Sequence, residues 1–338
     1  MHSLFWLVLV VAAVFAGLLL FTRSVKAKVE AALPPLGRFI DVPGARLHVV
    51  ERGQGPPLLL IHGLAGNLCN FTYGVVDRLA TRYQVIAVDR PGSGYSVRLP
   101  GTSAALEVQA DAMAALIDRL QLDRPVVVGH SLGGALSLCL AQRHPGKVRA
   151  LALVAPLTHP PSTMSSAFNG LKISAPWLQS FIAWTLAVPI SMRTRDRVLA
   201  EVFGPEPVPA DFGTKGGGFL GVRPPHFIAA CQDLHAVPQG MGELEAGYAS
   251  MKLPVQVLFG RGDLLLDPTE QGAALVKALP GATLTLVDGG HMLPLTQVAD
   301  TAGFIASVAE AAFGTSATPA TPAPSEPSAL AAPDLQPH

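Results

Sequence analysis

A short segment centred on Ser131 has the residue types and the spacing of a nucleophilic serine. Residues 129–133 read Gly-His-Ser-Leu-Gly; they follow a Val-Val-Val run at 126–128 and precede an apolar helical stretch. A sharp strand-to-helix turn would expose the hydroxyl, and the flanking glycines would avoid clashes that a Cβ would cause. The helix N-terminus would also place free N–H groups beside the reacting carbonyl. The segment therefore predicts nucleophilic catalysis by Ser131.

A serine hydroxyl is a poor nucleophile without a base, and two later segments supply a base and an acid. His291 lies in Asp-Gly-Gly-His-Met at 288–292, just after the last predicted strand. Asp263 ends the tight turn Gly-Arg-Gly-Asp at 260–263, directly after the preceding strand, and Asp267 is a rival in the same loop. Serine, acid and histidine is the chain order expected after such a turn. We predict His291 as the base and favour Asp263 as the acid that fixes its tautomer.

Two backbone N–H groups are expected to bind the oxyanion that forms when the serine attacks a carbonyl. One belongs to Leu132, directly after the serine. The other should lie in the loop Ile-His-Gly-Leu-Ala-Gly at 61–66, where Leu64 is the best candidate. Loss of one such donor typically costs about 3–4 kcal/mol of barrier. We expect His62 to shape this loop rather than to act in catalysis.

The elements that must position these residues alternate between strand and helix patterns. A hairpin is expected around Pro43-Gly44. Helical apolar spacing separates short apolar runs of the kind that form buried strands. These strand runs lie at 57–61, 84–88, 125–128, 149–154, 255–259 and 283–287, and the helices at 106–120, 132–143 and 269–279. The predicted fold class is therefore α/β, with a mostly parallel central sheet and helices on both faces.

The segment 157–250 breaks this alternation. It is rich in aromatic residues and proline breaks, and it contains a Gly-Gly-Gly run at 216–218. We interpret it as a mostly helical cap inserted over the carboxyl edge of the sheet. Its aromatic residues are expected to be packing residues: Phe168, Trp177, Phe181, Trp184, Phe203, Phe212 and Phe219.

With these motifs in place, the chain resembles the α/β-hydrolase superfamily over about residues 35–313. The resemblance rests on His-Gly at 62–63, Asp-Arg-Pro-Gly-Ser-Gly at 89–94, the Ser131 motif, Gly-Arg-Gly-Asp at 260–263 and Gly-His at 290–291. It implies a Ser131–Asp263–His291 triad, and it implies a structural turn without a catalytic role at 89–94. Serine at the nucleophile position departs from the aspartate of the family's haloalkane dehalogenases and epoxide hydrolases, and argues against both reactions.

The N-terminus carries an apolar run without charged residues at positions 4–21. As a helix, these 18 residues would extend about 27 Å, close to the hydrocarbon thickness of a bilayer. Lysine and arginine follow the run at positions 23, 26 and 28 and none precedes it, so we favour an uncleaved single-pass anchor at 1–22 over a cleaved signal peptide. The positive-inside tendency slightly favours a cytoplasmic catalytic domain.

The remaining boundaries follow from composition. We expect a linker at 23–34, the hydrolase core at 35–156 and 251–313, the cap at 157–250, and a disordered Pro/Ala/Ser-rich tail at 314–338.

Composition excludes other classes of function. Lysine plus arginine equals aspartate plus glutamate at 24 each, and no basic patch is interleaved with aromatics, so we exclude nucleic-acid binding. The three cysteines, Cys69, Cys139 and Cys231, have neither disulfide nor zinc-site spacing and are expected to be small buried apolar residues. The motifs imply no metal and no cofactor.

The predicted function is hydrolysis of a hydrophobic, lipid-like ester through an acyl-enzyme. The apolar cap and the membrane anchor favour such a substrate. Two alternatives on the same triad remain open, a carbon–carbon bond hydrolase and a thioesterase, because this fold carries many reactions. An alternative of another class is a non-catalytic binding protein that has kept the fold.

Overall fold

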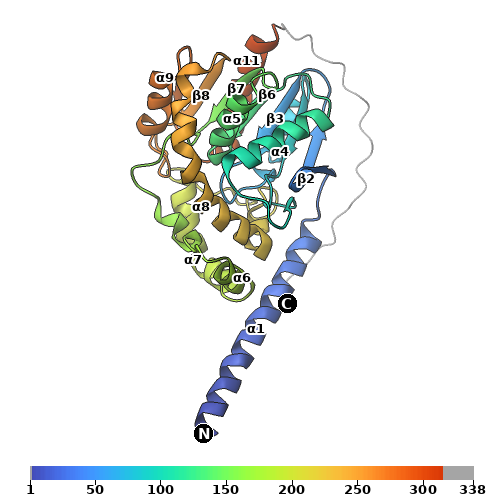
Figure 1. The fold of residues 1–338 in the computed structure, drawn as a ribbon, viewed down its shortest axis with the longest axis vertical. Helices are drawn as coiled ribbons and strands as arrows, with labels where there is room; N and C mark the ends of the chain where they lie inside the picture. Colours follow the sequence, from blue (N-terminus) through green and yellow to red (C-terminus); the bar gives the residue numbers. More distant parts are fainter. Residues whose placement is uncertain (1, 315–338) are drawn as a thin grey trace.

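The alternating elements form one mixed sheet with helices on both faces (Figure 1), in a computed structural model that describes residues 2–314. The strands are β1 (Arg38–Val42), β2 (Ala45–Arg52), β3 (Pro57–Ile61), β4 (Gln84–Val88), β5 (Val97–Arg98), β6 (Val126–His130), β7 (Ala150–Val154), β8 (Val255–Gly260) and β9 (Thr283–Val287). The helices that cover the sheet are α2 (Cys69–Thr72), α3 (Val75–Leu79), α4 (Leu106–Arg119), α5 (Leu132–Arg143), α9 (Ala274–Ala278), α10 (Leu293–Thr296) and α11 (Val298–Phe313). A π-helical turn, Thr269–Ala273, precedes α9.

The strand order is β1-β2-β4-β3-β6-β7-β8-β9, with β5 paired to β2. The pairs from β4 through β9 are parallel, whereas β1, β2 and β5 form antiparallel pairs at one end. The prediction of a mostly parallel sheet is confirmed. Strands β3 and β6 are neighbours at the centre, so the loops after them meet at one carboxyl edge, where ligand sites of parallel sheets form.

Side-chain alternation along the strands divides the core into two layers. Leu59, Ile61 and Val127 point into a cluster covered by α4 and α5, together with one long helix from the 157–250 segment. Leu58 and Val126 point to the other face, which α3 and α11 cover. A parallel sheet buried on both faces explains why its strands are continuous apolar runs.

The segment 157–250 is mostly helical, as expected. It contains a 3-10 turn at Ser166–Leu171, α6 (Pro176–Trp184), α7 (Ala187–Phe203), 3-10 turns at Gly218–Val222 and Tyr248–Ser250, and α8 (Pro224–Ala246). Helices α6 and α7 lie beyond the sheet, whereas α8 runs from them back to the core (Figure 1). The packing role expected for the aromatic residues holds for Phe203, which is fully buried, but not for Trp177, which is 72% exposed.

A single helix, α1 (His2–Ala32), precedes the core and projects from it (Figure 1). It is apolar and long enough to cross a membrane, and a signal sequence has the same properties. Residues 23–32, which we expected to form a linker, instead continue this helix up to the Pro34-Pro35 break. The tail expected to be disordered lies, apart from Gly314, outside the described residues.

A buried ion cluster joins α8 to the core. The carboxylate of Asp233, fully buried on α8, accepts hydrogen bonds from Arg90 at 2.7 Å and from Arg98 at 2.5 Å. The Gln109 side chain adds a third hydrogen bond, at 3.2 Å. Because the Arg90 side chain is also fully buried, neither charge has water to solvate it, and each depends on the other.

We expect Asp233→Asn to destabilise the fold by about 3–5 kcal/mol, because it leaves two arginines buried without a counter-charge. Urea unfolding monitored by circular dichroism measures this loss. The matched control is Glu243→Gln, an exposed carboxylate on the same helix, which should change the unfolding free energy by less than about 0.5 kcal/mol. Equal effects of the two substitutions would show that the buried cluster does not hold α8.

Candidate active site

Ser131 occupies a strained turn between β6 and α5. Its backbone has φ +54° and ψ −122°, a region that non-glycine residues rarely adopt. The turn is held by hydrogen bonds on both sides, from Ser131 N to Val154 O at 3.1 Å and from Leu157 N to Ser131 O at 2.9 Å. This is the strand–turn–helix geometry that exposes a nucleophilic hydroxyl.

The glycines around Ser131 are required by close backbone contacts. A Cβ on Gly133 would lie 2.2 Å from the carbonyl oxygen of Ile61, and one on Gly129 would lie 2.4 Å from the oxygen of Gly133. A Cβ on Gly63 would lie 2.8 Å from the Cβ of Ser131. The loop after β3 therefore lies directly against the serine turn, and the motif spacing Gly-x-Ser-x-Gly has a steric cause.

His291 and Asp263 are brought together by the loops after β9 and β8. The distance from His291 Nδ1 to Asp263 Oδ2 is 2.7 Å. The other carboxylate oxygen of Asp263 accepts from the backbone N–H groups of Leu265 and Leu266 at 2.8 and 3.0 Å. The carboxylate is thus fixed on both sides and holds Nδ1 of the imidazole as the protonated nitrogen, which leaves Nε2 free to act as a base.

Asp267, the rival acid, has a different environment. Its carboxylate accepts from the N–H groups of Thr269 and Glu270 at 2.7 and 3.0 Å and caps the helical turn that begins there. The backbone hydrogen bonds from Glu270 and Thr269 lower the pKa of Asp267. Of the two aspartates, only Asp263 forms a hydrogen bond with His291 among the described residues.

The two expected oxyanion donors lie at the same place. Leu64 and Leu132 line one pocket together with Ser131 and His291. Within residues 2–314, the backbone N–H groups of Leu64 and Leu132 make no hydrogen bond, so both are free to bind a ligand oxygen. Leu132 is the first residue of α5, where a helical N–H has no partner inside the helix.

Arg90 braces the loop that carries Leu64. Its guanidinium donates to the carbonyl oxygens of His62 and Gly63, each at 3.1 Å, and it also donates to Asp233 of α8 and to Gln109. The backbone N–H of Arg90 also donates to Nε2 of His62 at 3.0 Å. His62 Nδ1–H in turn contacts Gly63 O at 2.8 Å, which supports the loop-shaping role expected for this histidine.

A second brace comes from His226, near the start of α8. Its Nδ1 accepts from Gly94 N at 3.0 Å and its Nε2–H donates to Ala65 O at 3.1 Å. The carbonyls on both sides of Leu64 are therefore held by side chains. Arg90 was expected only as part of the structural turn at 89–94, and no role was expected for Asp233 or His226. Polar residues at 226 and 233 inside an apolar helix were the available signal.

His130, the residue before the serine, was also missed. Its Nε2–H donates to the backbone oxygen of His291 at 3.0 Å, and the two rings lie 4.9 Å apart. The contact fixes the backbone of the candidate base relative to the serine turn. Nδ1 of His130 is buried and has no hydrogen-bond partner among residues 2–314. Burial lowers the pKa of His130 to about 3, so the ring is neutral at pH 7.

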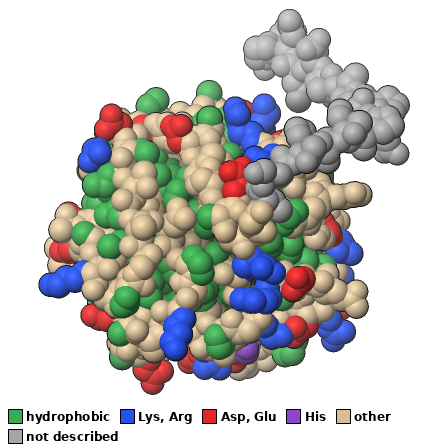
Figure 2. Space-filling model, turned by 90° about the horizontal axis from the view of Figure 1, so that it is seen from above, with side chains coloured by type: hydrophobic (Ala, Val, Ile, Leu, Met, Phe, Trp, Pro, Cys, Tyr) green, Lys and Arg blue, Asp and Glu red, His purple; other side chains and the backbone are tan. Residues whose placement is uncertain are grey.

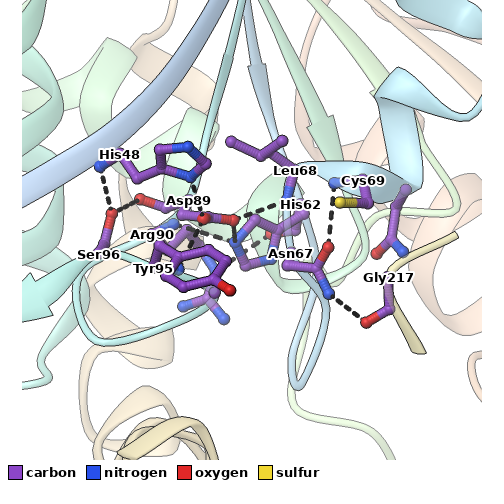
Figure 3. A network of polar contacts seen from close by, with 12 residues as sticks. His48, His62, Asn67, Leu68, Cys69, Asp89, Arg90, Tyr95, Ser96 and Gly217 are labelled. Carbon is purple, nitrogen blue, oxygen red and sulfur yellow. Dashed lines mark hydrogen bonds and ion pairs between the residues drawn. The ribbon is translucent and has the colours of Figure 1, made fainter. Parts of the chain in front are cut away.

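The turn at 89–94 is organised around the buried carboxylate of Asp89 (Figure 3). It accepts hydrogen bonds from His48 at 2.8 Å, Leu68 N at 2.7 Å and Tyr95 N at 2.8 Å. Burial alone would raise the pKa of Asp89, but the hydrogen bond from His48 and the adjacent histidines outweigh it and lower the pKa. Gly94 has φ +51°, and a Cβ there would lie 2.2 Å from the Asp89 carboxylate. The network is structural, as the sequence predicted for this turn.

The pocket in front of Ser131 has mostly apolar walls. Leu157 and Phe168 line it from the start of the cap, and Val237 and Met241 line it from α8. Asp233 also reaches the pocket, but its carboxylate is engaged by Arg90 and Arg98. The cleft therefore accommodates an apolar group next to the serine.

The cysteines lie outside this site. Cys139 and Cys231 are buried and Cys69 is half-buried, and all three are free thiols. Burial raises the pKa of each to about 12, which keeps the thiols protonated.

Comparison with known families matches this arrangement of motifs. Residues 56–297 fit the model of the alpha/beta hydrolase fold. The chain belongs to this family. The family and fold class predicted from the sequence are thereby confirmed, and family membership indicates hydrolase activity.

Individual relatives of this alpha/beta hydrolase differ in what their names describe. An uncharacterized protein of Mycobacterium tuberculosis is 28% identical over 286 residues, 82% of this chain and 81% of that protein. A 2-hydroxymuconate semialdehyde hydrolase of a Pseudomonas species is 36% identical over 123 residues, 36% of this chain and 44% of that protein. Among solved structures, a bacterial membrane phospholipase A matches with 25% identity and a TM-score of 0.66, over 93% of this chain and 99% of that one.

Three buried histidines should make the hydrolase sensitive to acid. Burial lowers the pKa of His62 and of His130 to about 3 each, and it also lowers the pKa of His226. Because the folded state disfavours their protonation, their contribution is complete above pH about 6.5 and is lost as the pH falls. We expect the unfolding free energy to fall from pH 6.5 to 4.5 by about 1.4 kcal/mol per pH unit for each of His62 and His130, and His226 adds to this fall in the same direction.

Urea unfolding at closely spaced pH values measures this slope in a range above the titration of most carboxylates. The variant His226→Gln keeps one donor and one acceptor at the position but removes one titrating group. Its slope should be smaller than that of the wild type, because one histidine fewer takes up a proton on unfolding. A wild-type free energy that does not change between pH 6.5 and 4.5 would contradict the neutral state of these histidines.

Proposed function

We propose that this alpha/beta hydrolase cleaves carboxylic esters with Ser131 as nucleophile, His291 as general base and acid, and Asp263 as the residue that orients His291. The observation that carries the proposal is the strained Ser131 turn, which opens into the same pocket as His291 while Asp263 binds the far nitrogen of the imidazole. The Leu64 and Leu132 N–H groups supply the oxyanion site.

The reaction follows from these positions. Ser131 Oγ attacks the ester carbonyl while His291 Nε2 takes the hydroxyl proton, and the oxyanion binds the two N–H groups. The tetrahedral intermediate collapses, and His291 gives the proton to the departing alcohol oxygen. Water then attacks the acyl-serine, His291 takes a proton from that water, and collapse releases the acid and returns the proton to Ser131.

The substrate proposed is an ester with a hydrophobic acyl group. The apolar pocket supports it, and so does the phospholipase name of the structural relative. A carbon–carbon bond hydrolase, suggested by the name of one sequence relative, would need polar or cationic groups for a charged substrate. The charged groups nearest the pocket, Asp233 and its arginines, are paired with one another. A thioesterase fits the same triad and differs only in the leaving group.

We also propose that α1 anchors the enzyme in a membrane as a single-pass helix. The helix is continuous from His2 to Ala32, and the packing of Phe15 against Phe181 of the cap supports an anchor that is retained. The basic residues Arg23 and Lys28 slightly favour a cytoplasmic catalytic domain by the positive-inside tendency.

The catalytic assignment is tested by substitutions in the triad. We expect Ser131→Ala to abolish labelling by a fluorophosphonate probe, and Asp263→Asn to lower kcat by roughly 10³–10⁴-fold because the imidazole loses its orientation. The matched control is Asp267→Asn in the same loop, which should retain near wild-type activity. Labelling of Ser131→Ala, or equal losses from the two aspartate substitutions, would contradict the assignment. No labelling of the wild type would favour a non-catalytic binding protein.

The acyl preference is tested with p-nitrophenyl esters of increasing chain length. We expect kcat/KM to rise with chain length until the apolar pocket is filled, since each buried CH2 contributes about 0.8 kcal/mol, or roughly fourfold. A response that is flat across chain lengths would contradict a hydrophobic acyl substrate. A parallel series of thioesters separates esterase from thioesterase by the ratio of the two rates.

A further inference from the structure

Helix α1 divides into a free part and a docked part. Every residue from His2 to Val14 is exposed, whereas one stripe in the second half is not. The stripe recurs every three or four residues, which is the spacing of one helix face. It consists of Phe15, Leu18, Leu19, Thr22, Val25, Lys26, Val29 and Glu30.

The docked face packs on the cap. The ring of Phe15 lies 5.0 Å from that of Phe181 on α6. Farther along, Glu30 pairs with Arg223 at 2.7 Å, at the start of α8. Figure 1 shows α6 beside the middle of α1 rather than at its end. These contacts fix the position along the axis of α1 at which the cap packs.

The free part of α1 is too short to cross a bilayer alone. From His2 to Val14 it has 13 residues, which rise about 20 Å, against a hydrocarbon thickness of about 30 Å. The charge-free run from Leu4 to Phe21 has the required length, but its last seven residues, about 10 Å of helix, are alongside the cap. If this run spans the membrane, the part of the cap beside Phe15 must enter the hydrocarbon.

The cap helices α6 and α7 expose large apolar side chains. Trp177 is 72% exposed and Phe181 40% on α6, and Ile190 is 52% and Met192 63% exposed on α7. Trp177 and Phe181 are four residues apart and share one face of α6, and exposed apolar side chains that share a face mark an interaction surface. By contrast, the face of the molecule on the side away from α1 mixes apolar side chains with acidic and basic ones (Figure 2).

Basic residues follow directly after the apolar ones. Arg193, Arg195 and Arg197 on α7 are exposed, and Arg195 lies 5.8 Å from the ring centroid of Phe219. Exposed Arg23 and Lys28 lie on α1 beyond the end of its apolar run. Arginine and lysine at the border of an apolar surface bind anionic lipid headgroups.

We propose that the cap docks on the lipid bilayer beside α1, with Trp177, Phe181 and Ile190 in the hydrocarbon and Arg193 and Arg197, which share the α7 face of Ile190, at the headgroups. The proposal rests on the membrane-anchor part of the proposed function and does not depend on the catalytic assignment. It places the cap, and the pocket mouth lined by Met164 and Phe168 of the same segment, close to the lipid phase.

Fluorescence quenching by brominated lipids tests the docking. The chain has three tryptophans, Trp6, Trp177 and Trp184. A variant with Trp6→Phe and Trp184→Phe retains Trp177 alone, and one with Trp177→Phe and Trp184→Phe retains Trp6 alone. The control carries Lys277→Trp with all three native tryptophans changed to phenylalanine, because Lys277 is exposed on α9, at the opposite end from α1 (Figure 1).

Each full-length variant is reconstituted in vesicles of phosphatidylcholine and phosphatidylglycerol with brominated acyl chains. We expect Trp6 and Trp177 each to lose a large part of their emission relative to unbrominated lipid, because both would lie within reach of the brominated chains, and the control to lose almost none. A urea unfolding transition with the same midpoint as that of the wild type verifies that each variant is folded.

The outcomes separate the two proposals. Quenching of Trp6 without Trp177 overturns cap docking and leaves the anchor in place. Quenching of neither residue overturns both.

Discussion

The close contact between the Ser131 turn and the loop after β3 constrains the rest of the site. Gly133 and Gly63 allow the two backbones to approach to a distance that no Cβ permits. The approach brings Leu64 and Leu132 into one pocket with Ser131, and it requires β3 and β6 to be neighbours in register. A strand inserted between β3 and β6 would separate the loop after β3 from the serine turn, and with it the two proposed oxyanion donors.

Helix α8 is a structural part of the active site as well as of the cap. Asp233 reaches the carbonyls of residues 62 and 63 through Arg90, and His226 holds the carbonyl of Ala65. A backbone N–H of Leu64 that is fixed before substrate binds needs no reorganisation when negative charge develops. The buried charges of Arg90 and Asp233 contribute little net stability as a pair. Their value lies in the fixed position that they give to the loop.

The sequence predicted the features that depend on neighbouring residues, such as strand and helix bounds. It did not predict contacts between residues far apart in the chain. The strands at 57–61, 84–88 and 283–287 and the helix at 132–143 have the predicted bounds, because apolar periodicity and Gly-Pro breaks are local signals. The choice of Asp263 over Asp267 also rested on a local turn, and the structure gives Asp263 the hydrogen bond to His291.

The side chains that hold the loop after β3 in place, Arg90, Asp233 and His226, had no such local signal. Arg90 and Asp233 are 143 positions apart, and no periodicity couples them. The cap aromatics were misjudged for a related reason: an aromatic residue that packs in a core and one that faces lipid are equally apolar in sequence. Only the exposure of Trp177 in the folded chain distinguishes the two cases.

The same helix that braces the loop also receives the anchor. At the start of α8, Arg223 pairs with Glu30 of α1, donates to Gly94 O at 2.6 Å and lies 4.2 Å from the ring centroid of Tyr95. Three residues later, His226 binds the N–H of Gly94 and the oxygen of Ala65. A short series of polar contacts therefore joins the docked half of α1 to the loop beside Ser131. Since α1 is held at both Phe15 and Glu30, its angle to the core is fixed by packing, and the proposed anchor would fix the orientation of the pocket relative to the membrane in the same way.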